Sequence, residues 1–222
     1  MIAKFRDRID AGRLLAARLA QYAGRPDVLV LALPRGGVPV AFEVAAALRV
    51  PLDILVVRKL GVPGHEELAM GAIATGGFCA LNDELIRSAE IPDAVIDEVA
   101  AREKRELDRR ALAYRGQAPA SELTEKTVIL VDDGIATGST MRVAIAAVRK
   151  QKPVRIIVAV PTAPESTFRE LEAEGVEVAV LILPEPFLAV GNSYEVFAQT
   201  SDEEVRDLLA RQPAGSWPRE NH

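Results

Sequence analysis

The sequence T-V-I-L-V-D-D-G-I-A-T-G-S-T-M-R, residues 127–142, decides the fold of this chain. It begins with four apolar residues, 128–131, a composition typical of a strand that is buried on both faces of a parallel sheet. Asp132 and Asp133 end the strand, a loop of small residues follows, and a helical pattern runs from Met141 to Lys150. The stretch therefore predicts a strand, a tight loop and a helix in succession.

The loop between the two acids and the helix has the composition of an anion-binding turn. Small residues let backbone N–H groups approach an anion closely, and the positive end of the helix dipole adds to the attraction. The loop residues are Gly134, Ala136, Thr137, Gly138, Ser139 and Thr140. The neighbouring carboxylates can accept hydrogen bonds from adjacent hydroxyls of a polyol. A sugar phosphate is the ligand that fits both features, whereas the glycine spacing matches neither the Walker A nor the G-x-G-x-x-G motif.

Residues 128–140 resemble the binding motif for 5-phosphoribosyl 1-pyrophosphate (PRPP) of type I phosphoribosyltransferases, in which T-G-x-T follows an apolar strand and two acids. The resemblance implies that residues 136–140 hold the 5-phosphate and that Asp132 and Asp133 hold the ribose 2- and 3-hydroxyls. It also implies Mg²⁺ as a cofactor, bound near these acids through substrate oxygens and waters and not by a protein cage. The alternative is an ordinary turn with capping Ser and Thr side chains and solvated acids.

Length and composition narrow the class of protein. The chain has 222 residues, of which 49% are hydrophobic and 27% charged, and its net charge is −5. We expect no nucleic-acid partner, because affinity for phosphate backbones requires clustered Lys and Arg. We also expect a cytoplasmic protein without a membrane partner, because no apolar run approaches the roughly 18 residues of a membrane span. The single cysteine, Cys79, is expected to be a small buried hydrophobe, with a reactive thiol as the alternative.

A second glycine-rich loop follows the first predicted strand, Val28–Ala32. A helix capped by Asp10 is expected before this strand, over residues 11–22, and another helix after the loop, over residues 38–48. Arg35 offers a fixed fork of donors for phosphate oxygens, and Gly36 and Gly37 let backbone N–H groups reach the same anion. In the family that the chain resembles, this position is the pyrophosphate loop. A plain turn is the alternative.

A basic pair, Arg58 and Lys59, follows the next predicted strand, residues 52–57. Ligands bind at the carboxyl ends of strands in doubly wound sheets, so we expect this pair to contact pyrophosphate or the other phosphates. A solvated start of a loop is the alternative. The residues assigned to catalysis are Asp132, Asp133, Arg35 and Lys59, which would act by positioning and electrostatics.

Residues 61–116 are predicted to form an insertion. A glycine pair between short apolar runs indicates a hairpin over residues 60–81, and the resemblance implies that this hairpin is mobile and closes over the reaction centre. Charge-dense helices are expected over residues 83–89 and, after Pro92, up to about residue 114. We expect weak ion pairs between residues four apart, namely Glu98–Arg102, Glu106–Arg110 and Lys104–Asp108. The long helix is expected to face solvent or a second subunit. The alternative is a cationic cover on the active site, made by Arg102, Lys104, Arg105 and Arg109.

Strand and helix patterns alternate through the rest of the chain, with strands at 154–160 and 176–183 and a helix at 164–174. This alternation predicts an α/β fold with a doubly wound, mostly parallel sheet of right-handed βαβ units, the type I phosphoribosyltransferase fold. We expect one domain over residues 1–222, with a core at 25–60 and 125–183, the insertion at 61–116 and a small C-terminal hood at 184–212.

The hood is expected to select the acceptor, because it resembles the end of the purine enzymes. Phe187 is the candidate to stack on a planar base, and the backbone of residues 190–192 to contact its edge, with ordinary packing of Phe187 as the alternative. A last helix is expected over residues 202–210, and frayed chain after Gln212. Ala136 stands where hypoxanthine and guanine enzymes carry an acid, so the resemblance leaves the acceptor open.

The resemblance implies a Mg-dependent transferase of nucleotide metabolism, and we expect a homodimer. It would transfer the phosphoribosyl group of PRPP to a nitrogen nucleophile, a nucleobase by expectation, and release pyrophosphate. A non-catalytic PRPP-sensing regulator on the same fold is the first alternative. A receiver-like phosphoacceptor is the second, but its acids should end the first strand, which here runs into Pro34 and Arg35.

Overall fold

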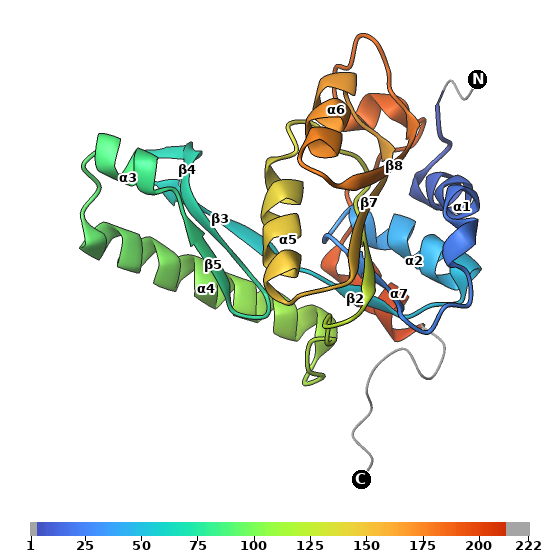
Figure 1. Ribbon diagram of the computed structural model, residues 1–222, viewed down its shortest axis with the longest axis horizontal. Coiled ribbons are helices and arrows are strands. Elements are labelled where there is room, and N and C mark those ends of the chain that lie inside the picture. The colour runs from blue at the N-terminus through green and yellow to red at the C-terminus, as the bar shows by residue number, and fades with distance from the viewer. Residues whose placement is uncertain (1–3, 212–222) are drawn as a thin grey trace.

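The computed structural model of the protein describes residues 4–211 and contains a five-stranded and a three-stranded sheet (Figure 1). The five-stranded sheet has the order β2-β1-β6-β7-β8, and all its neighbouring strands are parallel. Its strands are β1 (Val28–Ala32), β2 (Leu52–Ile54), β6 (Thr127–Val131), β7 (Arg155–Thr162) and β8 (Glu177–Ile182). The predicted α/β fold with a mostly parallel central sheet is confirmed.

Helices cover both faces of this sheet. Strand residues alternate between two buried clusters, with Val30 in one cluster and Leu29 and Leu31 in the other. The first cluster also contains residues of α1 (Arg8–Arg18), α2 (Gly37–Leu48) and α7 (Asp202–Ala210). The second contains residues of α5 (Ser139–Lys150) and α6 (Glu165–Ala173). Buried apolar runs on the strands therefore pack between two helical layers, as a doubly wound sheet requires.

The first helix begins earlier than expected. Asp7, and not Asp10, is the N-cap, because its side chain accepts a hydrogen bond from the Asp10 N–H at 2.8 Å. Asp10 instead pairs with Arg6 at 3.0 Å. After α1 a short 3-10 helix, Ala20–Tyr22, replaces the last turn of the predicted helix. The prediction was wrong on the cap because two acids stand within a turn and either one has the chemistry to cap.

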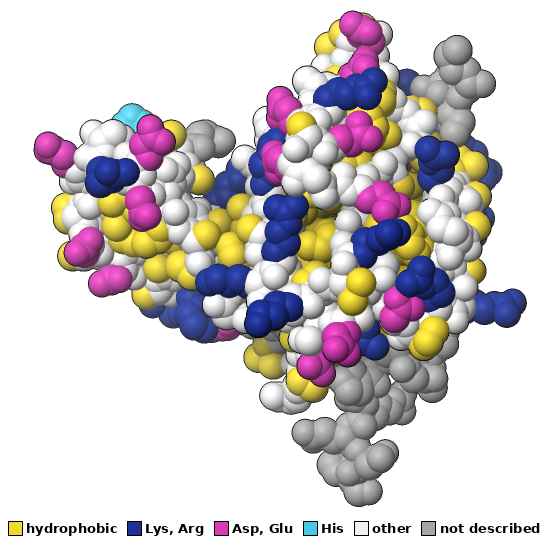
Figure 2. Space-filling view, in the orientation of Figure 1, with side chains coloured by type: hydrophobic (Ala, Val, Ile, Leu, Met, Phe, Trp, Pro, Cys, Tyr) yellow, Lys and Arg dark blue, Asp and Glu magenta, His cyan; other side chains and the backbone are white. Residues whose placement is uncertain are grey.

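Residues 57–115, here called the arm, extend away from the parallel sheet (Figure 1). The arm contains the antiparallel sheet β3-β4-β5 and two helices. Its elements are β3 (Val57–Val62), β4 (His65–Ala74), β5 (Phe78–Leu81), α3 (Asp83–Ser88) and α4 (Asp93–Arg115). Figure 2 shows a notch between the arm and the rest of the molecule, with hydrophobic side chains at its base. The hairpin and both helices agree with the prediction, and the mobility of the hairpin stays a prediction.

The predicted strand over residues 52–57 is divided between the two sheets. Leu55 N–H donates to the Ala32 carbonyl at 2.9 Å and so extends the parallel sheet, whereas Val56 exchanges hydrogen bonds with Thr75 of the arm. The apolar run is continuous because both sheets bury their parts of it. Arg58 therefore lies within β3 and not after the end of a parallel strand, and the prediction for this segment was wrong.

Cys79 is exposed, contrary to the prediction of a buried hydrophobe. It lies on β5, which is an edge strand of the arm's sheet. On this strand Phe78 is buried, and the three residues that follow it are exposed. The apolar composition of a short edge strand does not determine which of its residues the core covers.

The tail returns across the carboxyl side of the sheet. A 3-10 helix, Val190–Ser193, precedes α7, whose bounds match the predicted helix and whose N-cap is Ser201. The expected fraying after Gln212 lies outside the described residues. Among the helices of residues 4–211, none combines the length and the apolar composition that a membrane span requires. The expected division into one domain with core, insertion and hood stays a prediction.

Candidate active site

Two loops meet at the carboxyl ends of the adjacent strands β1 and β6. Ala32 pairs with Val131 at the end of this ladder. One residue further, the Leu33 N–H donates to the Val131 carbonyl at 2.9 Å. The loop with Arg35 and the loop with the two acids therefore start side by side at one edge of the sheet.

Gly36 and Gly37 leave the room that the two acids occupy. A Cβ on Gly36 would lie 2.0 Å from Oδ2 of Asp133. A Cβ on Gly37 would lie 2.7 Å from the Val131 carbonyl oxygen and 2.9 Å from Cα of Asp132. Gly36 has a φ of −59°, so the requirement there is for space and not for an unusual backbone conformation. The predicted residues Gly36, Gly37, Asp132 and Asp133 are therefore in direct contact.

The two carboxylates have different surroundings. Arg8 donates from Nε to Oδ2 of Asp133 at 2.8 Å, and its second terminal nitrogen lies 2.8 Å from the same oxygen. The side chains of Arg8 and Asp133 are only 12% and 14% exposed. Asp132 accepts a hydrogen bond from the Asp133 N–H, but burial and then the charge of Asp133 raise its pKa well above the ordinary range. Asp132 therefore takes up a proton more readily, while Asp133 faces a guanidinium.

Arg8 and Tyr194 surround Asp133, and sequence reasoning missed both residues. Arg8 also donates to the Ala198 carbonyl at 2.6 Å, and its guanidinium lies 4.0 Å from the centroid of the Phe197 ring. The Tyr194 hydroxyl donates to the Asp133 carbonyl at 2.5 Å, and burial raises the pKa of Tyr194. Arg8 and Asp133 are 125 residues apart, so no local spacing links them. The one available signal is a cation in the first turn of a helix, where the helix dipole disfavours it.

The loop after β6 leads directly into the N-terminus of α5. Gly138 has a φ of 74°, and α5 begins at Ser139. Within residues 4–211, the N–H groups of Ala136, Thr137, Gly138 and Thr140 donate to no protein acceptor. These donors lie at the positive end of the α5 dipole. The geometry therefore suits an anion, as the sequence predicted for residues 134–140.

Side chains from α5 and α6 hold the carbonyl groups of the same loop. Thr167 Oγ1 donates to the Ala136 carbonyl at 2.8 Å, and Arg142 donates to the Thr137 carbonyl at 2.9 Å. Arg142 is held in turn by Glu170 and Glu174, each at 2.7 Å. The carbonyl groups of Ala136 and Thr137 are therefore satisfied by side chains of the two helices that follow the loop.

Arg35 and Asp133 line the same pocket, which has a volume of about 370 Å³. The lining residues are Arg8, Arg35, Gly36, Asp133 and the tail residues Phe197, Ala198, Gln199 and Thr200. Arg35 also lies 3.8 Å from the Asp202 carboxylate, which accepts a hydrogen bond from the Tyr114 hydroxyl at 2.6 Å. The pocket therefore joins the loop after β1, one acid of the pair and the tail.

Arg58 and Lys59 are not brought to this pocket as a pair. They are consecutive residues of β3, so their side chains point to opposite faces of the arm's sheet. Arg58 donates two hydrogen bonds to Glu103 of α4, at 2.8 and 2.5 Å, and Lys59 is exposed. Neither is among the described residues that line the pocket. The expectation that both follow a parallel strand at its ligand-binding end was wrong, and their contact with a phosphate stays a prediction.

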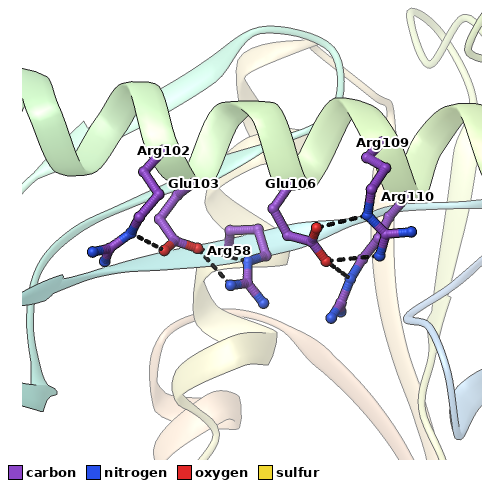
Figure 3. A network of polar contacts seen from close by, with 6 residues as sticks. All are labelled: Arg58, Arg102, Glu103, Glu106, Arg109 and Arg110. Atoms are coloured by element: carbon purple, nitrogen blue, oxygen red, sulfur yellow. Dashed lines mark hydrogen bonds and ion pairs between the residues drawn. The ribbon is translucent and has the colours of Figure 1, made fainter.

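Figure 3 shows the ion-pair network that joins Arg58 to α4. The buried carboxylate of Glu103 lies between Arg58 and Arg102, and Glu106 lies between Arg109 and Arg110 at 2.8 and 2.7 Å. The two arginines lower the pKa of Glu106 to about 2. The predicted pairs Glu106–Arg110 and Lys104–Asp108 are present, whereas among the described residues none joins Glu98 to Arg102. Of these ion pairs, the one between Arg58 and Glu103 joins α4 to β3.

An aromatic residue of the tail lies at the pocket, but it is Phe197 and not the predicted Phe187. Phe197 lies 5.0 Å from the Tyr194 ring, centroid to centroid, and against Arg8. Phe187 is half-buried in the segment after β8 and is not among the described residues that line the pocket. Val190 packs on the loop after β6, because a Cβ on Gly134 would lie 2.5 Å from its Cγ1. The tail thus covers the site, and the stacking role of Phe187 stays a prediction.

The acid pair has the donor chemistry for a divalent cation held mainly by other ligands. Within residues 4–211, no three side chains of His, Cys, Asp or Glu are grouped so that they could hold a metal ion. Mg²⁺ prefers oxygen ligands and commonly uses one or two carboxylates with substrate phosphates and waters. Asp132 and Asp133 fit that pattern, although Oδ2 of Asp133 is already bonded to Arg8.

The chain matches the family model "Phosphoribosyl transferase domain" over residues 2–179. It is 47% identical over 207 residues to a provisionally named phosphoribosyl transferase of Mycobacterium tuberculosis strain CDC 1551 / Oshkosh, and equally to its counterpart in strain H37Rv. These matches cover 93% of this chain and 46% of each relative, so the chain spans about half the length of the curated relatives it matches. The crystal structure of TT1426 from Thermus thermophilus is 42% identical, with a TM-score of 0.81, and the match covers 93% of this chain and 97% of that one. Because so little of this chain lies outside the match, the matched region includes residues of the arm.

Proposed function

The chain belongs to the phosphoribosyl transferase domain family, and we propose that it transfers the 5-phosphoribosyl group of PRPP to a nitrogen nucleophile and releases pyrophosphate. One observation carries the proposal. The loop after β1 and the loop after β6 touch through Gly36, Gly37 and the acid pair, so a single ligand can contact both. PRPP carries a phosphate, two ring hydroxyls and a pyrophosphate, which are the groups that these loops suit.

Each end of PRPP has its own set of donors in this proposal. The N–H groups of residues 136–140 bind the 5-phosphate, and Asp132 and Asp133 accept hydrogen bonds from the ribose hydroxyls. Arg35 and the N–H groups of Gly36 and Gly37 bind the pyrophosphate, with Arg58 or Lys59 as further cations when the arm closes. Arg35 supports this assignment because it already lies 3.8 Å from a carboxylate, that of Asp202, which a substrate anion could replace.

The reaction is a displacement at the anomeric carbon. The bond from that carbon to the pyrophosphate oxygen breaks, its electron pair leaves with pyrophosphate, and the nitrogen lone pair forms the new bond. Positive charge develops on the ribose, and the proton lost by the nitrogen passes to water. The residues act by holding both ends of PRPP in line and by placing the Asp133 carboxylate beside the ribose ring. Closure of the arm would exclude water from this centre.

Mg²⁺ would supply charge neutralisation of the pyrophosphate, with Asp132 and Asp133 nearest to it and most of its ligands from substrate and water. The site gives less information on the identity of the acceptor than on the binding of PRPP. Ala136 has no acidic group to assist a proton transfer, which disfavours a 6-oxopurine, and a nucleobase of another kind is our expectation. We further propose a cytoplasmic homodimer of nucleotide metabolism.

A PRPP-sensing regulator is the second candidate, because most of the site could bind PRPP without turning it over. The test that separates the two is pyrophosphate release from PRPP and Mg²⁺ across a panel of purines, pyrimidines and other nitrogen nucleophiles. Release with one acceptor supports the transferase. PRPP binding without release from any acceptor would promote the regulator.

Asp133→Asn tests the assignment of the acid pair. Asn keeps the size of the side chain but removes the charge, so PRPP affinity should fall. Arg8, which is only 12% exposed, then lacks its carboxylate partner, so the melting temperature should fall as well. PRPP affinity is therefore compared at a temperature at which the melts show both proteins to be folded. Asp108→Asn is the matched control, because Asp108 is an exposed acid of α4 that pairs with Lys104, away from the pocket. Equal PRPP affinity of wild type and Asp133→Asn would contradict the proposed function.

A further inference from the structure

One guanidinium joins three segments that are far apart in the sequence. Arg8, in the first turn of α1, bonds to Asp133 of the loop after β6 and to the Ala198 carbonyl of the tail. The face of the same group lies 4.0 Å from the centroid of the Phe197 ring. The segment that carries the acid and the segment that lines the pocket therefore share one side chain.

Two features of the position of Arg8 are unfavourable for the stability of the fold. Arg8 is only 12% exposed, and burying a charge is unfavourable unless it is paired and hydrogen-bonded. The dipole of α1 opposes a cation in the first turn. The contacts with Asp133 and the tail must therefore offset both terms.

The contacts also determine which oxygen of Asp133 is available. Both Arg8 nitrogens meet Oδ2, whereas within residues 4–211 no donor is bonded to Oδ1. A carboxylate held at one oxygen can present the other in a fixed place. Asp133 is therefore oriented before any ligand arrives.

We propose that Arg8 is a positioning residue for PRPP: it fixes Asp133 so that Oδ1 meets a ribose hydroxyl, and it couples this acid to the tail that lines the pocket. The inference rests on the proposed function. It predicts that the tail and the acid respond together when Arg8 is changed, because this one side chain contacts both.

The contacts require a guanidinium and not just a positive charge. A planar fork can donate to Asp133 and to the Ala198 carbonyl in one plane while its face stacks on Phe197. A lysine ammonium can replace one of these contacts but not the set. The dissociation constant of Arg8→Lys for PRPP should therefore lie between those of the wild type and Arg8→Ala.

The experiment is calorimetric titration of the full chain with PRPP in Mg²⁺ buffer, for wild type, Arg8→Ala, Arg8→Lys and Arg13→Ala. Arg13 is the matched control, because it lies on the same helix and its pair with Glu43 is 64% exposed on the arginine side. We expect the dissociation constant to rise at least about tenfold in Arg8→Ala, as for the loss of one hydrogen bond to a charged group, and to stay unchanged in Arg13→Ala. Thermal melts of all four proteins show whether the variants are folded.

Chemical rescue separates positioning from a general loss of stability. Guanidinium ion added at millimolar concentration, far below denaturing levels, should restore PRPP affinity to Arg8→Ala and leave Arg13→Ala unchanged. If the wild type and Arg8→Ala bind PRPP with equal affinity, the role of Arg8 is overturned and the proposed function is not. Weak binding by Arg8→Ala that guanidinium does not restore also overturns it, because the loss is then structural. Absence of PRPP binding in the wild type overturns the proposed function and the inference together.

Discussion

Gly36→Ala places one methyl group against the acid on which the proposed site depends. The new Cβ would lie 2.0 Å from Oδ2 and 2.6 Å from Cγ of Asp133, whereas ordinary contact begins at 3.4 Å. Residue 36 has a helical φ of −59°, so alanine meets no backbone strain there. Either the carboxylate or the loop after β1 must move.

The size of the effect follows from what holds Asp133. Its carboxylate is bonded to Arg8 at 2.8 Å, so it cannot retreat from the new methyl group without lengthening that contact. A hydrogen bond to a charged group contributes about 1.5–3 kcal/mol. We therefore expect Gly36→Ala to raise the dissociation constant for PRPP by a factor of about 10 to 150.

The assay is PRPP titration with a parallel thermal melt, and Gly24→Ala is the control. Gly24 has a φ of 68°, and in the described chain only its own sequence neighbours lie within 4 Å of the new methyl group. Alanine there should cost about 1–2 kcal/mol of stability and no affinity. The two variants should both melt earlier, but only Gly36→Ala should bind PRPP weakly. Unchanged affinity in Gly36→Ala would refute the argument that this glycine exists to make room for Asp133.

Three further predictions concern stability, pH and thiol exposure. Asp53 forms a buried ion pair with Arg115 at 2.7 Å, and Asp53→Ala should lower the free energy of unfolding by about 3–5 kcal/mol in a denaturant titration. Glu165→Ala, which breaks an exposed pair, should lower it by less than about 0.5 kcal/mol. The pKa of Asp132 in the folded protein is raised above the ordinary 3.8, so the folded protein holds that proton more tightly than the unfolded chain and its stability falls as pH rises. Asp132→Asn should remove this fall and should have a higher melting temperature than the wild type at pH 7. A variant with the same pH dependence of stability as the wild type would contradict the assignment. Cys79 should react with a thiol reagent in the native protein, and reaction only after unfolding would show that it is covered.

Elements whose local pattern is uninterrupted were predictable from the sequence. The buried apolar run of β6, the alternation of strand and helix through β8 and the charge-dense helix α4 are present close to their expected bounds. The reason is that burial on both faces of a parallel sheet requires continuous apolar residues, and a long exposed helix requires charges at helical spacing. The same local patterns predicted that Arg35, Gly36, Asp132 and Asp133 lie at one edge of the sheet.

Features that depend on the third dimension were not predictable in this way. Residues 52–57 look like one strand because both sheets bury their share, and only the hydrogen bonds of Leu55 and Val56 show where one sheet ends. The basic pair at residues 58 and 59 lies within an arm strand, which sends its two side chains to opposite faces. The role of Arg8 depends on a contact across 125 residues, for which a single sequence carries no pattern.

The glycines after β1 serve two needs, and the second one links the motifs. In the sequence, Gly36 and Gly37 are explained by the close approach of backbone N–H groups to a phosphate. In the structure, the space that their side chains would fill is taken by Asp133 and Asp132. Arg8 bonds to Oδ2 of Asp133, the same oxygen that a Cβ on Gly36 would lie closest to. The first turn of α1 and the two loops therefore form one unit, in which the residue allowed at each position depends on the other two.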